Sequence, residues 1–162
     1  MQKKILVVDD SALARRILTK ILESLGYSVD TAKDGEEAIR KALNDNYDLI
    51  TLDIEMPNKN GIEVIKEIMG KKPTRILVIS AYTTEDASLT LDALDSGALG
   101  YITKPGTVGT SLQQIEEEIK LKVKEVLSIP KIKVLMNRKK ATKLKESLSK
   151  MNTIDTENFN PN

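Results

Sequence analysis

Four short apolar runs recur along the chain, and stretches with helical periodicity separate them. The runs cover residues 5–8, 49–52, 76–79 and 101–103. Short continuous apolar runs bounded by turn residues are typical of strands buried on both faces, as in parallel sheets. Between them, apolar residues recur at the i, i+3 and i+4 spacing of helices that pack on a core. The alternation predicts an α/β protein with a parallel sheet and helices on both faces.

The limits of the elements follow from capping and turn residues. We expect five strands, near residues 5–8, 27–32, 49–53, 75–81 and 100–103. The first helix should begin after Ser11 and end at Gly26, because Ser caps helix N-termini and Gly ends helices. The second should open at residues 34–37, and the others are expected over residues 62–69, 85–96 and from after Gly109 to Leu127. The order of the strands cannot be read from the alternation.

A residue suited to phosphoryl chemistry follows each of the four runs. Asp9 and Asp10 follow the first run, Asp53 the second, Ser80 the third and Lys104 the fourth. We expect these side chains to share one crevice, because functional groups gather at the carboxyl ends of strands in open α/β sheets. Crowded carboxylates oppose one another's ionisation unless a positive charge lies between them. The pattern therefore predicts a site for a phosphoryl group and for Mg²⁺, a hard cation that prefers oxygen ligands.

One carboxylate could act as a nucleophile towards a phosphoryl donor, with Lys104 and Ser80 binding the phosphoryl oxygens. A nucleotide-binding loop of the P-loop type is absent from the sequence, so the donor is expected to be a phosphorylated partner. Taken singly, each residue has a simpler explanation, as a turn, a helix cap or a strand end. Their occurrence together, at the ends of four strands, favours the functional interpretation.

Histidine and cysteine are absent from the 162 residues. Within these residues their absence excludes a Ser-His-Asp triad, a thiolate or His-ligated metal site and a phosphohistidine carrier. No apolar stretch approaches the about 20 residues that a membrane-spanning helix needs, and no signal-peptide pattern precedes the first strand. We therefore expect a cytoplasmic protein that does not contact membranes.

Four segments resemble the signatures of receiver domains of two-component response regulators. They are ILVVDDS at residues 5–11, LDIEMPNKNG at 52–61, VISA at 78–81 and GYITKP at 100–105. The resemblance covers about residues 2–127 and implies a flavodoxin-like (βα)5 fold with strand order 2-1-3-4-5. It also implies a phosphorelay function in which Asp53 accepts a phosphoryl group from a histidine kinase.

The resemblance assigns the metal ligands as well. It implies that Mg²⁺ is bound by Asp10, by Asp53 and by the backbone carbonyl of Glu55. Asp9 would hold the ion through water. The protein would then not be an enzyme with an external substrate, and its only reactions would be its own phosphorylation and dephosphorylation.

The same resemblance implies a switch. Lys104 and Ser80 would contact the phosphoryl group, and Tyr101 would turn into the space that Ser80 leaves. The peptide bond between Lys104 and Pro105 would be cis. The repacking would change a surface made by the fourth helix, the fifth strand and the fifth helix, which would contact a downstream protein.

A finer resemblance concerns residues 53–57, 61–69 and 91–98, which are similar to the receiver half of chemotaxis protein-glutamate methylesterases. It implies a chemotaxis-type kinase as the partner. The methylesterase domain of that family does not follow in this sequence, and its triad requires a His. Methylesterase activity is therefore not expected of these residues. An excised regulatory piece and a natural single-domain regulator both remain open.

The sequence predicts a receiver domain over residues 1–127 and a basic, partly disordered linker or tail over residues 128–162. Residues 131–150 hold eight basic side chains and one acidic side chain. A solvated linker is the expected role, and nucleic-acid binding is the weaker alternative. A homodimer through the long last helix stays open, as does a magnesium-dependent phosphatase of the haloacid dehalogenase type. Turnover of phosphate monoesters would identify the phosphatase.

Overall fold

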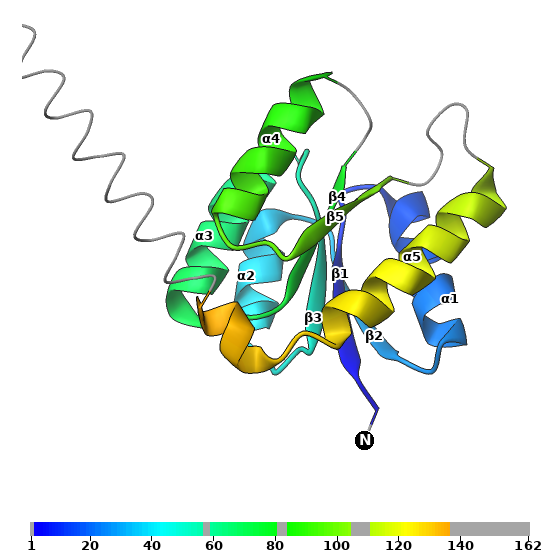
Figure 1. Cartoon of the computed structure of the whole chain (residues 1–162), viewed down its shortest axis with the longest axis horizontal. Helices are drawn as coiled ribbons and strands as arrows, with labels where there is room; N and C mark the ends of the chain where they lie inside the picture. Colours follow the sequence, from blue (N-terminus) through cyan, green and yellow to red (C-terminus); the bar gives the residue numbers. More distant parts are fainter. Residues whose placement is uncertain (1, 57–58, 81–83, 105–110, 137–162) are drawn as a thin grey trace, which may run out of the picture.

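The computed structural model describes residues 2–56, 59–80, 84–104 and 111–136, which Figure 1 shows in colour. Five strands form one sheet in this part of the chain: β1 (Lys4–Val8), β2 (Ser28–Ala32), β3 (Leu49–Asp53), β4 (Ile76–Ser80) and β5 (Gly100–Thr103). All neighbours are parallel, in the order β2-β1-β3-β4-β5. The predicted fold class and strand order are both confirmed.

Helices follow the strands in alternation: α1 (Ala12–Ser24), α2 (Gly35–Asn44), α3 (Gly61–Lys71), α4 (Thr84–Asp95) and α5 (Leu112–Leu127). In Figure 1, α1 and α5 cover one face of the sheet, and α2, α3 and α4 cover the other. The predicted cap of the first helix is present, and Asp34 also caps the second helix. The side chain of Ser11 accepts a hydrogen bond from the amide of Ala14, and that of Asp34 accepts one from the amide of Glu37.

The helix α3 is longer at both ends than the predicted residues 62–69. Asn60 caps it by accepting a hydrogen bond from the amide of Glu63 at 3.0 Å. At the other end Gly70 lies inside the helix and does not end it. Gly ends a helix where it adopts a left-handed conformation, as Gly26 (φ 91°) and Gly97 (φ 123°) do. Sequence alone does not distinguish the two situations.

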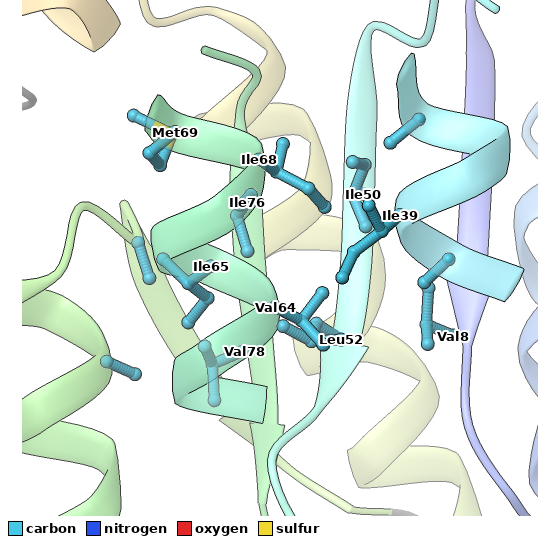
Figure 2. Packing of buried hydrophobic residues seen from close by; sticks show 14 of the residues in the cluster. Val8, Ile39, Ile50, Leu52, Val64, Ile65, Ile68, Met69, Ile76 and Val78 are labelled. Atoms are coloured by element: carbon cyan, nitrogen blue, oxygen red, sulfur yellow. The ribbon is translucent and has the colours of Figure 1, made fainter. Parts of the chain in front are cut away.

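Two aliphatic layers hold the helices on the sheet. Because side chains alternate along a strand, β1 sends Leu6 and Val8 into one layer and Ile5 and Val7 into the other. Figure 2 shows the first layer, with side chains from α2 and α3 packed on the strands. The sheet is therefore buried on both faces, and its carboxyl edge is left to carry polar groups. No helix in the described part of the chain is long and apolar enough to cross a membrane.

The chain after α5 packs on the same body. Residues 131–136 are helical (orange in Figure 1). Val134 is 1% exposed and belongs to the layer under α2, α3 and α4. Arg75 connects this segment to β4, since its Nε donates a hydrogen bond to the carbonyl of Ile129 at 2.9 Å. This packing was not predicted from the sequence, and the division of the chain at residue 127 stays a prediction.

We expect Val134→Ala to lower the free energy of unfolding by about 1–3 kcal/mol, because the change removes buried methyl groups and leaves a cavity. Ile132 is 67% exposed in the same short helix, so Ile132→Ala is the matched control, with an expected effect below about 0.5 kcal/mol. Urea unfolding of the full chain measures both. Equal effects would mean that residues 129–136 do not pack on the sheet in solution.

Candidate functional site

Three carboxylates meet at the carboxyl edge of the sheet. Asp9 and Asp10 directly follow β1, and Asp53 is the last residue of the neighbouring β3. One carboxylate oxygen from each lies within 4.8 Å of the others. Asp9 and Asp53 are buried, while Asp10 is exposed. Parallel pairing of β1 with β3 causes this convergence, because it brings the carboxyl ends of both strands to the same edge.

Asp9 presents one satisfied and one unsatisfied oxygen. Its Oδ1 accepts hydrogen bonds from the amide of Ser11 at 2.9 Å and from Lys104 Nζ at 3.3 Å. Its Oδ2 is buried and has no hydrogen-bond partner among the described residues. A buried carboxylate oxygen without a donor is costly, and a cation would satisfy it. With the oxygens of Asp10 and Asp53 nearby, the donor set fits a hard divalent ion such as Mg²⁺.

Lys104 lies between the two buried carboxylates. It directly follows β5, and its amide donates to the carbonyl of Ser80 at 2.8 Å, which fixes the backbone. Its Nζ lies 3.0 Å from Asp53 Oδ2 and 3.3 Å from Asp9 Oδ1. Burial opposes the charge of Lys104, but its hydrogen bond to Asp53 and the charges of Asp53 and Asp9 outweigh burial and raise the pKa. Lys104 therefore stays protonated and supplies fixed positive charge.

The loop that follows β3 holds the carboxylate of Asp53 in place. Its Oδ1 accepts a hydrogen bond from the amide of Glu55 at 3.1 Å. Burial and the charge of Asp9 raise the pKa of Asp53 to about 7, although the hydrogen bond and charge of Lys104 and the amide of Glu55 act in the opposite direction. A carboxylate with a raised pKa is more basic and a better nucleophile than an exposed one, provided that a cation keeps it ionised.

Gly61 keeps the loop after Asp53 close to the site. Its amide donates to the carbonyl of Ile54 at 3.0 Å, so the chain returns to β3 at the start of α3. A Cβ atom at Gly61 would lie 2.7 Å from Ile54 Cα and 3.1 Å from the carbonyl oxygen of Asp53. Only glycine permits this approach, because any Cβ atom would collide with the backbone of Ile54.

The predicted switch residues, Ser80 and Tyr101, lie in different surroundings. Ser80 is 7% exposed, and its hydroxyl accepts a hydrogen bond from the hydroxyl of Thr90 on α4 at 3.3 Å. Tyr101 is 51% exposed and lines an open groove of about 850 Å³ with residues of α5, among them Glu117 and Leu121. Thr90 was not among the residues predicted from the sequence. Its signal was a polar residue three positions before the buried Ala93, on the core-facing side of α4.

Of the remaining predicted site residues, the structure describes Glu55 but not Pro105. The side chain of Glu55 is exposed, and its amide reaches Asp53 as stated above. The predicted cis bond before Pro105 and the basic residues 138–150 lie outside the described residues.

A family model described as the response regulator receiver domain matches residues 5–116, more than half of the chain. The chain belongs to the response regulator receiver family. This receiver is 44% identical over 129 residues to a protein-glutamate methylesterase/protein-glutamine glutaminase of Thermotoga maritima. The match covers 78% of the receiver chain and 38% of that relative. A relative with the same description from Methanococcus maripaludis is 43% identical, with 91% and 40% covered. The receiver thus spans about two-fifths of the length of these relatives.

Solved structures agree with this assignment. The response regulator domain of Thermotoga maritima CheB is similar to the receiver with a TM-score of 0.72 and 42% identity, over 80% of the receiver and 99% of that chain. The response regulator TrrA of Thermotoga maritima, solved in complex with Mg²⁺-BeF, gives a TM-score of 0.63 and 40% identity. There 77% of the receiver and 99% of that chain are covered.

Proposed function

We propose that the chain accepts a phosphoryl group from a histidine kinase on Asp53, in a magnesium-dependent reaction, and that it acts in chemotaxis signalling. The observation that carries the proposal is the position of Lys104, whose Nζ contacts the buried Asp53 and Asp9 beside an unsatisfied oxygen of Asp9. A fixed ammonium beside a buried carboxylate is suited to a dianionic phosphoryl group arriving at Asp53.

Each group has a part in the transfer. An oxygen of Asp53 attacks the phosphorus of phosphohistidine, an O–P bond forms, the P–N bond breaks, and the released imidazole takes up a proton. Lys104 stabilises the negative charge on the transferred group, and the amide of Glu55 orients Asp53 for attack. Asp10, Asp53 and the carbonyl of Glu55 are the proposed magnesium ligands, and Asp9 would hold the ion through water. Bound Mg²⁺ would supply the positive charge that keeps these carboxylates ionised.

The output follows from the charge that phosphorylation adds. An aspartyl phosphate brings new acceptor oxygens, which draw the hydroxyl of Ser80 towards Asp53. Tyr101, half exposed on β5, then turns into the vacated space and changes the surface of α4, β5 and α5. We assign that surface to a downstream protein. The methylesterase relatives favour chemotaxis as the setting, and the structure of TrrA with Mg²⁺-BeF supports the metal requirement.

Amide NMR of the ¹⁵N-labelled full chain tests the proposal directly. Beryllofluoride stands in for the phosphoryl group and is added in the presence of Mg²⁺. We expect shifts around Asp53 that spread to Ser80 and Tyr101, and no such shifts when Mg²⁺ is left out. A spectrum that does not respond to beryllofluoride with Mg²⁺ would overturn the proposed function.

A further inference from the structure

We propose that Thr90 is a positioning residue that holds the hydroxyl of Ser80 away from Asp53 and so sets how readily the phosphorylated state forms. The inference rests on the proposed phosphoryl switch and adds to it a residue of α4. A hydrogen bond from α4 would then contribute to the free energy of the switch, in addition to α4 being part of the surface that the switch changes.

The evidence begins with two buried hydroxyls. Ser80 and Thr90 are each 7% exposed, and the hydroxyl of Thr90 donates to that of Ser80 at 3.3 Å. Buried hydroxyls are costly when they lack partners, so this bond stabilises the position that Ser80 occupies here. The two residues come from different elements, the end of β4 and the second half of α4. The bond therefore connects a strand-end residue of the site to a helix of the proposed output surface.

The direction of the Ser80 side chain determines whether its hydrogen bond with Thr90 keeps its hydroxyl away from Asp53. Along β4, Ile76 and Val78 belong to the layer under α2, α3 and α4, and Ile79 belongs to the layer under α1 and α5. Side chains alternate along a strand, so Ser80 points to the α4 side with Ile76 and Val78. Asp53 is aligned with Ile79 in the β3–β4 register and points to the opposite side. The hydroxyl of Ser80 must leave Thr90 to reach a phosphoryl group on Asp53.

The exchange has a cost on both sides. Ser80 exchanges its hydrogen bond with Thr90 for one to the phosphoryl group, and Thr90 loses Ser80 as an acceptor. Release of Ser80 thereby changes the hydrogen bonding of α4 itself. Thr90 opposes activation until the phosphoryl oxygens compete for the hydroxyl of Ser80. When Ser80 moves, the hydrogen bonding of Thr90 on α4 changes.

Thr90→Val tests the inference, because valine keeps the shape of threonine and removes its hydroxyl. The readout is the dissociation constant of beryllofluoride at saturating Mg²⁺, followed by amide NMR of the full chain. Without the hydrogen bond from Thr90, Ser80 reaches the bound group at a lower cost in free energy. We therefore expect Thr90→Val to bind beryllofluoride about 2- to 10-fold more tightly. Thr90→Ser keeps the hydroxyl and is expected to bind like the natural protein. Unchanged or weaker binding by Thr90→Val would overturn the inference.

A double-mutant cycle with Ser80→Ala separates this role from a general packing effect. In the Ser80→Ala background no hydroxyl remains for Thr90 to hold, so adding Thr90→Val is expected to leave the dissociation constant unchanged. Equal effects of Thr90→Val with and without Ser80 would contradict the proposed role. Failure of the natural protein to respond to beryllofluoride would instead overturn the phosphoryl switch on which the inference rests.

Discussion

Asp53→Asn is expected to reduce phosphorylation of the chain to background, both from a phosphorylated histidine kinase and from a small acyl phosphate. The amide of asparagine is not a nucleophile, and an acyl phosphate cannot form on it. Transfer of radiolabel from the donor to the protein measures the effect. The change is isosteric, and Asp53 is 1% exposed, so the surrounding packing is retained.

Asp92→Asn serves as the matched control, because Asp92 is exposed on α4 and lies outside the carboxylate cluster. This variant should take up label like the natural chain. Normal labelling of Asp53→Asn would show that another residue accepts the phosphoryl group. The assignment of Asp53 as the acceptor would then be wrong.

Lys104→Met is expected to lower the free energy of unfolding by about 2–4 kcal/mol at pH 8 in the presence of a metal chelator. Methionine keeps the apolar stem but leaves the buried Asp53 and Asp9 without their ammonium partner. Urea unfolding measures the loss. The double variant with Asp53→Asn should recover most of it, because only one of the two buried carboxylates then remains.

The loss should be smaller at pH 5. The pKa of Asp53 is already raised to about 7 by burial and by the charge of Asp9, and it rises further without Lys104. A carboxyl group with a folded-state pKa above its unfolded value binds more protons in the folded state, so stability falls as the pH rises between those two values. Protonation of Asp53 at pH 5 therefore removes much of the repulsion. A loss that is equal at pH 5 and pH 8 would contradict this account.

Lys120→Met is the control for the Lys104 variant. Lys120 forms an i,i+4 ion pair with Glu116 at 3.2 Å on α5, and its side chain is 27% exposed. Ion pairs of this kind contribute less than about 1 kcal/mol, so we expect a small effect. A comparable loss in both variants would mean that position 104 has no special electrostatic role.

Much of the fold was predictable because local patterns agreed with the tertiary arrangement. The apolar runs at β1, β3 and β4 are continuous since those strands are buried on both faces. The position of Asp53 near Asp9 and Lys104 was predictable for a related reason, since parallel strands bring their carboxyl ends to one edge. The topology accounts for their proximity, whereas the contacts of Lys104 Nζ at 3.0 Å to Asp53 and 3.3 Å to Asp9 depend on how the side chains pack.

Other features depend on partners that are distant in sequence or on another element. Val134 lies in a basic segment that resembles a solvated linker, yet it is 1% exposed because the chain crosses back to the layer under α2, α3 and α4. Gly61 looks like a loop glycine, and its tight contact with Ile54 becomes visible only when the loop is closed. Neither contact leaves a local pattern, because the packing partner of each residue lies on another segment.

The sequence by itself therefore determined the α/β class, the limits of most elements and the group of residues at the carboxyl edge. The periodicity and the strand-end residues encode these features locally. Only the tertiary structure decided that the hydroxyl of Ser80 accepts a hydrogen bond from Thr90, and that Lys104 contacts both buried carboxylates. A hydrogen bond or an ion pair requires two side chains to lie close together in space. The packing of separate elements determines which side chains do so.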